Sequence, residues 1–338
     1  MMTTSDASLA AMPAAVTLVI PGRNCERTLS ACLDAVTRLL AAGELSEIVF
    51  VDDGSTDATR AIAGRYPVRI LEGGGVGPGA ARNLGWRAAR TELVWFIDSD
   101  CVAEPDALQR LCACVSEPDV GGAGGSYANL RPDSTLACLI HEEIASRHRN
   151  MGDDVDFLGG FNVLYRRAAL EAVEGFDECE VNGPGAPGAE DCDLSFRLVQ
   201  AGWRLKFDRQ SRVGHFHPTS LRRYLRSQYL HGRFRVRLYF RHSGKMAGDD
   251  YSGLADHLQP PLALATLLLL PWIWAPYVPL LAGVGLAATT ACSLPRCTTL
   301  SALPWKTWIW FPLVSSLRAA ARGAGIVSGF LPRASSAR

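Results

Sequence analysis

The stretch Thr91-Glu92-Leu93-Val94-Trp95-Phe96-Ile97-Asp98-Ser99-Asp100 decides the fold. Its apolar centre contains aromatic and β-branched residues, a composition typical of a strand buried in a parallel sheet. The run ends in two carboxylates separated by one serine. Because ligands bind beyond the carboxyl ends of strands in open α/β sheets, we expect Asp98 and Asp100 to lie over a site. Alternate carboxylates suit Mg²⁺ or Mn²⁺, although Asp and Ser are also common in an ordinary turn.

Short strands and helices alternate on both sides of this stretch. We expect strands at 16–20, 47–51, 68–71 and 93–97. We expect helices at 27–40 and 80–89, and one more that follows the second strand and ends at Arg65. This regular spacing predicts a parallel, doubly wound sheet with right-handed crossovers. Later strands are expected at 120–127, at 162–165 and near Leu205 and Val213. Later helices are expected at 105–115, 135–148, 166–173 and 190–201, and a long basic helix, capped by Ser220, runs towards Arg241.

The composition of the chain excludes some classes of protein and leaves others open. Its 338 residues suffice for one large or two modest domains, and its 34 basic residues balance its 34 acidic ones. This overall balance gives no hint of partners, and we expect no nucleic-acid partner. The 10 cysteines form no Cys-x-x-Cys pair, which favours small buried thiols in a reducing compartment over disulfides or a zinc site.

The C-terminal part of the chain changes character. Residues 260–290 carry no charge, a length that allows one long tilted membrane helix or a proline-broken pair. Pro271, Pro276 and Pro279 favour the broken or re-entrant form, and a buried core helix is the ordinary alternative. We expect a disordered lead at 1–13 without a signal peptide, a soluble domain at 14–245, and a membrane-associated region at 246–338.

Polar motifs follow the second strand and the third. Asp52 and Asp53 end a strand, where a carboxylate can accept a hydrogen bond from a nucleotide base or ribose, or simply order a βα turn. The glycine-rich loop 73–79 precedes a helix carrying Arg82, which could face a diphosphate or could be an ordinary surface arginine. The loop lacks the dinucleotide-binding and P-loop signatures, so those two classes are excluded.

Three further motifs lie in the second half of the chain. Glu190 and Asp191 begin a helix after the Gly/Pro-rich loop 182–189, which suits a general base or simple complementation of the helix dipole. The run 157–162 brings backbone close to a ligand or forms a tight turn. The segment 211–217 ends a strand with two histidines, His215 and His217. Such histidines are commonly exposed at the surface or hydrogen-bonded in the core, without a role in a site.

The order of these motifs resembles glycosyltransferase family 2. The resemblance covers about Val16 to Arg241 and rests on Pro-x-x-Asn (21–24), Val-Asp-Asp-Gly-Ser-Thr-Asp (51–57), Ala-Arg-Asn-x-Gly (81–85), Asp-Ser-Asp (98–100), Gly-Gly-x-Asn (159–162), Glu-Asp-x-Asp-Leu (190–194) and Val-Gly-His (213–215). It implies a GT-A fold: an α/β protein with a Rossmann-like, mostly parallel sheet flanked by helices, here followed by C-terminal hydrophobic helices. Residues 14–127 would form the nucleotide-sugar-binding half and 128–245 the acceptor half.

The resemblance also implies a role for each matching residue. Asp191 would be the catalytic base, and Asp100 with His215 would hold Mn²⁺ or Mg²⁺, with His217 as the alternative ligand. The nucleotide side would comprise Pro21, Asn24, Glu26, Asp52, Asp53, Arg82, Asp98 and Ser99, and the acceptor side Gly159, Gly160, Asn162 and Glu190.

The implied activity is inverting, metal-dependent transfer of a sugar from a nucleotide-diphosphate sugar, a UDP-sugar in the first instance. The acceptor would be lipid-linked or a membrane-proximal glycan, at the cytoplasmic face of the cell membrane, with one or two C-terminal passes. The basic helix 222–241 would suit an anionic membrane surface or could be a solvated basic face.

Two departures from the family pattern bear on this interpretation. Arg23 stands where an aromatic residue usually precedes the asparagine of the first motif. Residues 228–232 replace the Gln-x-x-Arg-Trp of processive members, which disfavours a polymer-extruding synthase. A non-catalytic nucleotide- or glycan-binding scaffold is the alternative function. A nucleotidyltransferase would need a glycine-rich basic signature after the first strand, and residues 21–24 do not supply it.

Overall fold

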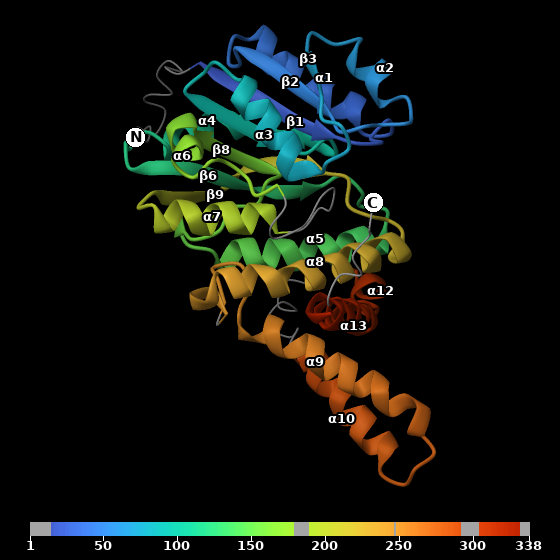
Figure 1. Ribbon diagram of the computed structural model, residues 1–338. Helices are drawn as coiled ribbons and strands as arrows, with labels where there is room; N and C mark the ends of the chain where they lie inside the picture. Colours follow the sequence, from blue (N-terminus) through green and yellow to red (C-terminus); the bar gives the residue numbers. More distant parts are fainter. Residues whose placement is uncertain (1–14, 179–188, 247, 292–303, 332–338) are drawn as a thin grey trace, which may run out of the picture.

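The computed structural model describes residues 15–178, 189–246, 248–291 and 304–331 (Figure 1). The lead expected at 1–13 lies outside these ranges, as does the loop expected at 182–189 except for its last residue, Ala189. One mixed sheet with helices on both faces forms the upper part of the molecule in Figure 1, and the C-terminal helices lie below it.

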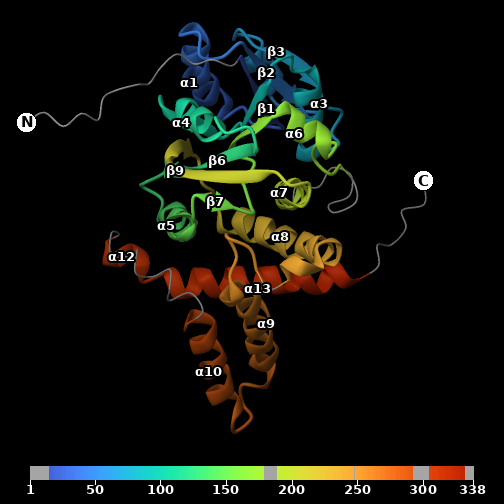
Figure 2. The same cartoon turned by 90° about the vertical axis from the view of Figure 1, so that its left-hand side faces the viewer.

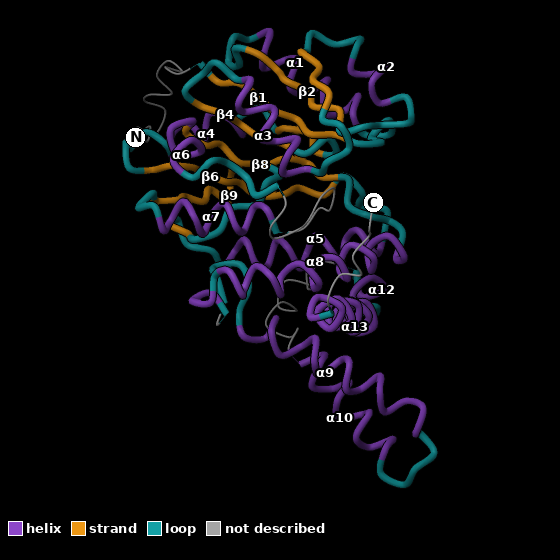
Figure 3. The backbone as a smooth tube through the Cα atoms, viewed as in Figure 1, coloured by secondary structure: helices purple, strands orange, loops and turns teal. Residues whose placement is uncertain are grey.

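Nine strands of the described chain form the sheet, in the order β3-β2-β1-β4-β8-β6-β9-β5, with β7 paired to β9 (Figure 3). Their bounds are β1 (Val16–Gly22), β2 (Glu47–Asp52), β3 (Arg69–Glu72), β4 (Leu93–Ile97), β5 (Cys101–Ala103), β6 (Val120–Asn129), β7 (Asp154–Val155), β8 (Asn162–Arg166) and β9 (Arg204–His215). The first four strands are mutually parallel, so the alternating pattern predicted this half of the sheet correctly.

The expectation of a mostly parallel sheet was wrong. Strand β8 runs antiparallel to both β4 and β6, and four of the eight pairings between described strands are antiparallel. The two short strands expected near Leu205 and Val213 are one strand, β9, which follows β6 through register shifts. Strand β6 crosses the boundary expected at 127/128, so both halves share a single sheet.

Helices cover the two faces of the sheet and bury a core on each side (Figure 2). The helices α1 (Leu29–Ala41) and α4 (Ala107–Cys114) bury their apolar faces in one core. The short helix α2 (Thr59–Ala63) contributes Ala63 to the same core. The other receives α3 (Pro78–Ala88), α6 (Arg167–Ala172) and α7 (Glu190–Gln200). The central strand β4 contributes fully buried side chains to both cores, as its continuous apolar run predicts.

A layer of helices lies beyond the sheet. It contains α5 (Thr135–Asn150), α8 (Leu221–Arg241), the 3₁₀ turn η1 (Ser243–Lys245), α9 (Leu254–Leu269), the 3₁₀ turn η2 (Leu270–Trp272), α10 (Val278–Ala291), α12 (Trp305–Trp308) and α13 (Phe311–Phe330). The Ser220 side chain accepts a hydrogen bond from Arg223 N and caps α8, which confirms the predicted start of the basic helix.

The uncharged stretch forms the proline-broken helix pair, α9 and α10, which projects away from the rest of the molecule (Figures 1 and 2). Among the described helices, none combines the length and the apolar character that crossing a bilayer would require.

The helices α8 and α13 approach each other closely through glycines. A Cβ atom at Gly232 would lie 2.1 Å from Arg322 O, and one at Gly325 would lie 2.0 Å from Tyr229 O. Buried ion pairs join the other helices of the layer to α5: Arg147 of α5 pairs with Asp256 of α9 at 2.6 Å, and Arg318 of α13 pairs with Glu143 of α5. The C-terminal helices are therefore packed as part of the fold.

The contact between α3 and β1 gives a test of the sheet packing. A Cβ atom at Gly85 would lie 2.2 Å from Val19 Cγ1, so Gly85→Ala should destabilise the protein by about 1–3 kcal/mol in urea denaturation. Gly64→Ala is the matched control, because its nearest contact would be an ordinary 3.6 Å and its backbone is right-handed helical. Equal stability of the two variants would contradict this packing.

Candidate active site

Strand pairing brings the acidic end of β4 to the histidine end of β9. Residues 98–100 form the turn after β4, and Cys101 of the following β5 pairs with His215 of β9. As a result, His215 Nε2 lies 3.3 Å from Asp100 Oδ2. The sequence prediction that Asp100 and His215 belong to one site agrees with this geometry.

His215 is held in place by further rings. Its Nδ1 lies 2.8 Å from His217 Nδ1, and His217 Nε2 lies 3.2 Å from His141 Nδ1 on α5. Burial lowers the pKa of His217 to about 2 and that of His141 to about 4, so both stay neutral. In one tautomer His215 donates from Nδ1 to His217 and presents an unprotonated Nε2 towards Asp100. His217 therefore supports His215 and does not itself face Asp100.

The ligand atoms fit a hard divalent cation. Among the described residues, Asp100, Cys101 and His215 form a group whose possible ligand atoms lie within 4.8 Å of one another. Burial raises the pKa of the Cys101 thiol well above its usual value, so it is a poor ligand for such an ion. Desolvation raises the pKa of Asp100. The charge and the hydrogen bond of His215 oppose this rise, and the net pKa of Asp100 lies below its usual value. One carboxylate and one imidazole leave room for substrate phosphates, as Mg²⁺ and Mn²⁺ sites commonly do.

Arg82 connects the two sides of the site. Its guanidinium donates to Asp98 Oδ1 at 2.8 Å and to Glu190 Oε1 at 3.1 Å, and its side chain is only 6% exposed. The residues that it joins lie at the end of β4 and at the first turn of α7. The Nε atom is buried without a hydrogen-bond partner in the structure. Arg82 is thus a buried bridge rather than a surface arginine.

Asp191 lies beside this bridge with a chemically useful pKa. Its Oδ1 accepts from Cys192 N at 2.8 Å and its Oδ2 from Gly160 N at 3.4 Å. Desolvation and then the adjacent Glu190 carboxylate raise its pKa to about 6, against the opposing effect of Arg82. A half-buried carboxylate that titrates near neutral pH suits proton abstraction.

The residues expected on the nucleotide side order two neighbouring loops. Asn24 adopts φ 52° and its Oδ1 accepts from Thr56 N at 2.8 Å, while Glu26 Oε2 accepts from Ala58 N at 3.1 Å. Asp52 accepts from Ser55 N, and Asp53 accepts from Val76 N and Gly77 N, both at 2.9 Å. Pro21 lies in β1 beside β2. These contacts fix the loops beyond β1 and β2, where the sequence placed the nucleotide.

Three predicted assignments need correction. Asn162 has no exposed surface, because its amide is enclosed by Trp95 Nε1 and Ser211, and so it belongs to the core rather than to the acceptor side. Glu190 is 6% exposed and paired with Arg82. Arg82 is itself enclosed, so it presents no free guanidinium to a diphosphate. Gly160 serves a close approach, since a Cβ there would lie 3.0 Å from Arg82 Nη2.

Two residues near the site escaped the sequence analysis. Tyr127 stacks on Phe161 with ring centroids 3.6 Å apart and lies 4.6 Å from the His215 ring. His141 supports His217 from α5. In the sequence, Tyr127 is one aromatic residue on a predicted strand and His141 one polar residue on a predicted helix. Neither pattern indicates which side chain the residue will contact.

Comparison with known proteins shows that the chain is similar in sequence to glycosyltransferases. The Glycosyl transferase family 2 model matches residues 17–173. The pre-mycofactocin glycosyltransferase of Mycobacterium tuberculosis is 28% identical over 70% of this chain and 50% of its own length. An N-acetylglucosaminyltransferase of Sinorhizobium fredii is 29% identical over 64% and 56%. The chain thus spans about half the length of the curated relatives that it matches.

A solved structure supports the same fold. The mannosyltransferase PcManGT from Pyrobaculum calidifontis, in complex with GDP-Man and Mn²⁺, matches with a TM-score of 0.58 at 22% identity. The match covers 92% of this chain and 87% of that one. The chain is thus similar to glycosyltransferase family 2 over residues 17–173. It shares the fold of that mannosyltransferase, a mixed sheet with flanking helices that matches the GT-A fold.

The Arg82 bridge can be tested by stability. Arg82→Met leaves Asp98 and Glu190 without this partner in a poorly solvated place, so we expect a loss of about 3–5 kcal/mol. Arg87→Met is the control, because Arg87 and its partner Glu178 are about half exposed and such pairs contribute less than about 1 kcal/mol. Urea denaturation of both variants measures the difference, and similar losses would show that the bridge is not special.

Proposed function

We propose that this protein is an inverting glycosyltransferase of family 2, which moves a sugar from a nucleotide-diphosphate sugar to a lipid-linked or membrane-proximal glycan acceptor. The proposal rests on two observations: Asp100 faces His215, and the Asp191 carboxylate has a pKa of about 6. A UDP-sugar is the first donor to test, and a GDP-sugar the second, because PcManGT was solved with GDP-Man and Mn²⁺.

Each residue has a defined task in this reaction. Asp100 and His215 would hold Mn²⁺ or Mg²⁺, whose charge would stabilise the departing diphosphate. Asp191 takes the proton of the acceptor hydroxyl, which attacks the anomeric carbon from the face opposite the leaving group. Arg82 fixes Asp98 and Glu190 and so keeps the donor and acceptor sides in register. A single displacement needs a single base, unlike the two carboxylates of a glycosidase.

The membrane is the proposed location, with the chain at its cytoplasmic face. Large apolar side chains are exposed on the α9–α10 pair, among them Leu268 at 74%, Trp274 at 94% and Tyr277 at 76%. Exposed apolar surface of this extent favours contact with lipid or another apolar partner. The described cysteines are all free thiols, which fits a reducing compartment.

The scaffold alternative lacks such support. A binding module has no need of a carboxylate whose pKa is raised towards neutrality beside a facing Asp–His pair. The two experiments that follow separate binding from transfer.

The first concerns the metal. Asp100→Asn should weaken UDP or GDP binding in Mn²⁺ by at least about tenfold and remove the difference between Mn²⁺ and EDTA, because one of two protein ligands is lost. Isothermal titration calorimetry measures this effect. Asp106→Asn, an exposed carboxylate paired with Arg110, is the control and should bind as the wild type does. Equal nucleotide affinity with and without metal in the wild type would exclude the metal assignment.

The second concerns the base. With a pKa of about 6, Asp191 is ionised above that pH, so kcat/KM should rise as pH increases through about 6 and then level off. Asp191→Asn should lower turnover by about 10²–10⁴ while UDP or GDP affinity stays unchanged. The asparagine avoids ionising a poorly solvated carboxylate, so the melting temperature at pH 7 should not fall.

The exposed carboxylate Asp119 provides the control, and Asp119→Asn should keep the wild-type rate and pH profile. Sugar transfer by Asp191→Asn at the wild-type rate would show that Asp191 is not the catalytic base. Joint loss of transfer, nucleotide binding and thermal stability would instead assign Asp191 a structural role at the start of α7.

A further inference from the structure

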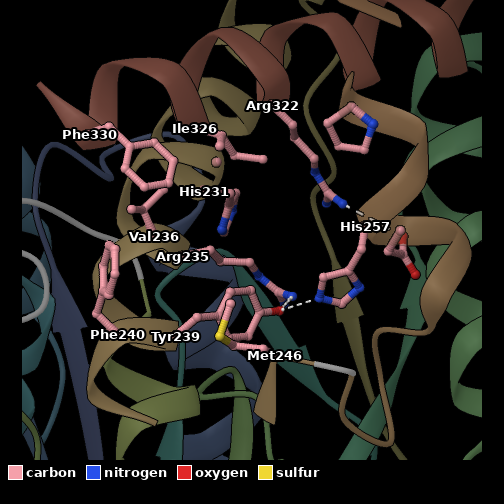
Figure 4. Close-up of a pocket in the computed structure, with 13 residues that line it drawn as sticks. His231, Arg235, Val236, Tyr239, Phe240, Met246, His257, Arg322, Ile326 and Phe330 are labelled. Carbon is pink, nitrogen blue, oxygen red and sulfur yellow. Dashed lines mark hydrogen bonds and ion pairs between the residues drawn. The ribbon is translucent and has the colours of Figure 1, made fainter. Parts of the chain in front are cut away.

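A pocket of about 180 Å³ lies between α8, α9 and α13, helices that carry none of the residues proposed for the transfer (Figure 4). Its walls come from the C-terminal half of α8, the start of α9 and the end of α13. The α9 wall ends at Pro260, where the uncharged stretch of the α9–α10 pair begins. The pocket is therefore continuous with the apolar part of the C-terminal layer.

The pocket has a cationic end and an apolar end. Figure 4 shows Arg235 and Arg322 reaching into it from two different helices, near His257, and Phe240 and Phe330 at the other end. The two phenyl rings meet edge to face with centroids 5.9 Å apart, and they are 72% and 63% exposed. This arrangement matches an amphiphile with an anionic head and a hydrocarbon tail.

The two arginines at this end outnumber Asp256, the one carboxylate among the described residues that line the pocket. Arg235 donates to the Tyr239 and Ser252 hydroxyls at 2.9 and 2.8 Å, and within the described part of the chain it has no ion pair. Arg322 donates to Gln228 and lies 3.9 Å from Asp256, which Arg147 already engages through two hydrogen bonds.

This imbalance has an energetic consequence. Desolvation, with the nearby Arg147, lowers the pKa of Arg322 to about 10. Poorly solvated positive charge that exceeds the neighbouring negative charge is unfavourable, and an anion from outside would relieve this excess. A phosphate group suits two converging guanidinium groups because each can donate two hydrogen bonds to its oxygens.

We propose that this pocket binds the phosphate head group of an anionic membrane lipid, whose hydrocarbon chain leaves past Phe240 and Phe330. The inference rests on the membrane contact in the proposed function and adds to it the class of lipid. Arg235 and Arg322 hold the phosphate, and the aromatic end receives the first part of the chain. The site thereby anchors the C-terminal layer to a bilayer by a specific head group in addition to exposed apolar surface.

The experiment measures binding of the full chain to vesicles by flotation. Wild type should bind vesicles containing phosphatidic acid more tightly than vesicles of phosphatidylcholine alone. Arg235→Gln and Arg322→Gln should each lose about fivefold in affinity for the anionic vesicles, the effect expected for one basic side chain at an anionic surface. Phe330→Ser, which changes no charge, should also weaken that binding.

Two exposed arginines on the first turn of α8 are matched controls. Arg222→Gln and Arg223→Gln remove the same charge away from the pocket and should keep the preference for phosphatidic acid. Inorganic phosphate should compete poorly, since it lacks the chain. Equal losses in the controls, full competition by inorganic phosphate, or no preference in the wild type would each overturn the proposal.

Two further measurements separate this inference from the proposed function. Trp272→Ser with Trp274→Ser, in the exposed tip of the hairpin, should weaken binding to both kinds of vesicle, which tests the membrane contact alone. Arg322→Gln should keep wild-type UDP or GDP affinity. Full anionic-vesicle binding by both Arg322→Gln and Phe330→Ser would sink the lipid site while leaving sugar transfer intact.

Discussion

The double ion pair of Arg82 is the constraint on which the site depends. It joins Asp98 to Glu190, and its link to Glu190 connects residues 108 positions apart in the chain. Removing a guanidinium from water is costly, and two hydrogen-bonded carboxylates on opposite sides offset that cost only in one geometry. Asp191 is the next residue after Glu190, and Asp100 lies two residues after Asp98. A single side chain therefore links the segment of the proposed base to the segment of the proposed metal ligands.

The helix that carries Arg82 is built around the same task. Gly79 lets α3 approach the 175–177 turn, where a Cβ would lie 2.7 Å from Asp177 O, and Asn83 exchanges two hydrogen bonds with the Phe176 backbone. Gly85 packs on β1. The Ala-Arg-Asn-x-Gly motif thus places a helix between the sheet and the acceptor side. A phosphate loop would present backbone N–H groups to a ligand, whereas here two such groups are bound by Asp53.

Local sequence predicted the first half of the sheet and the helices well, because buried strands and amphipathic helices carry their own periodicity. The mixed sheet was not predictable in this way. Strand β8 has the same apolar pattern whether it runs parallel or antiparallel to β4, and that direction depends on the connection between them. Site residues divide similarly. Asp100 and His215 were predicted by their order in the chain, whereas the enclosure of Asn162 and Arg82 depends on partners distant in sequence.

Helix α8 connects the C-terminal layer to the rest of the fold. It contacts both the candidate site and the proposed membrane surface. At its end, Arg241 and His242 bind the fully buried Asp193 of α7, at 3.4 and 2.9 Å. Along its length it packs against α13 through backbone contacts that only glycine allows. Burial raises the pKa of the Cys192 thiol, and Arg235 opposes that rise, so a cation of the pocket acts one residue from Asp191. Because a helix packed on both faces moves as one body, a lipid held at Arg235 and Arg322 would fix the orientation of Asp191 relative to the bilayer from which we propose that the acceptor comes.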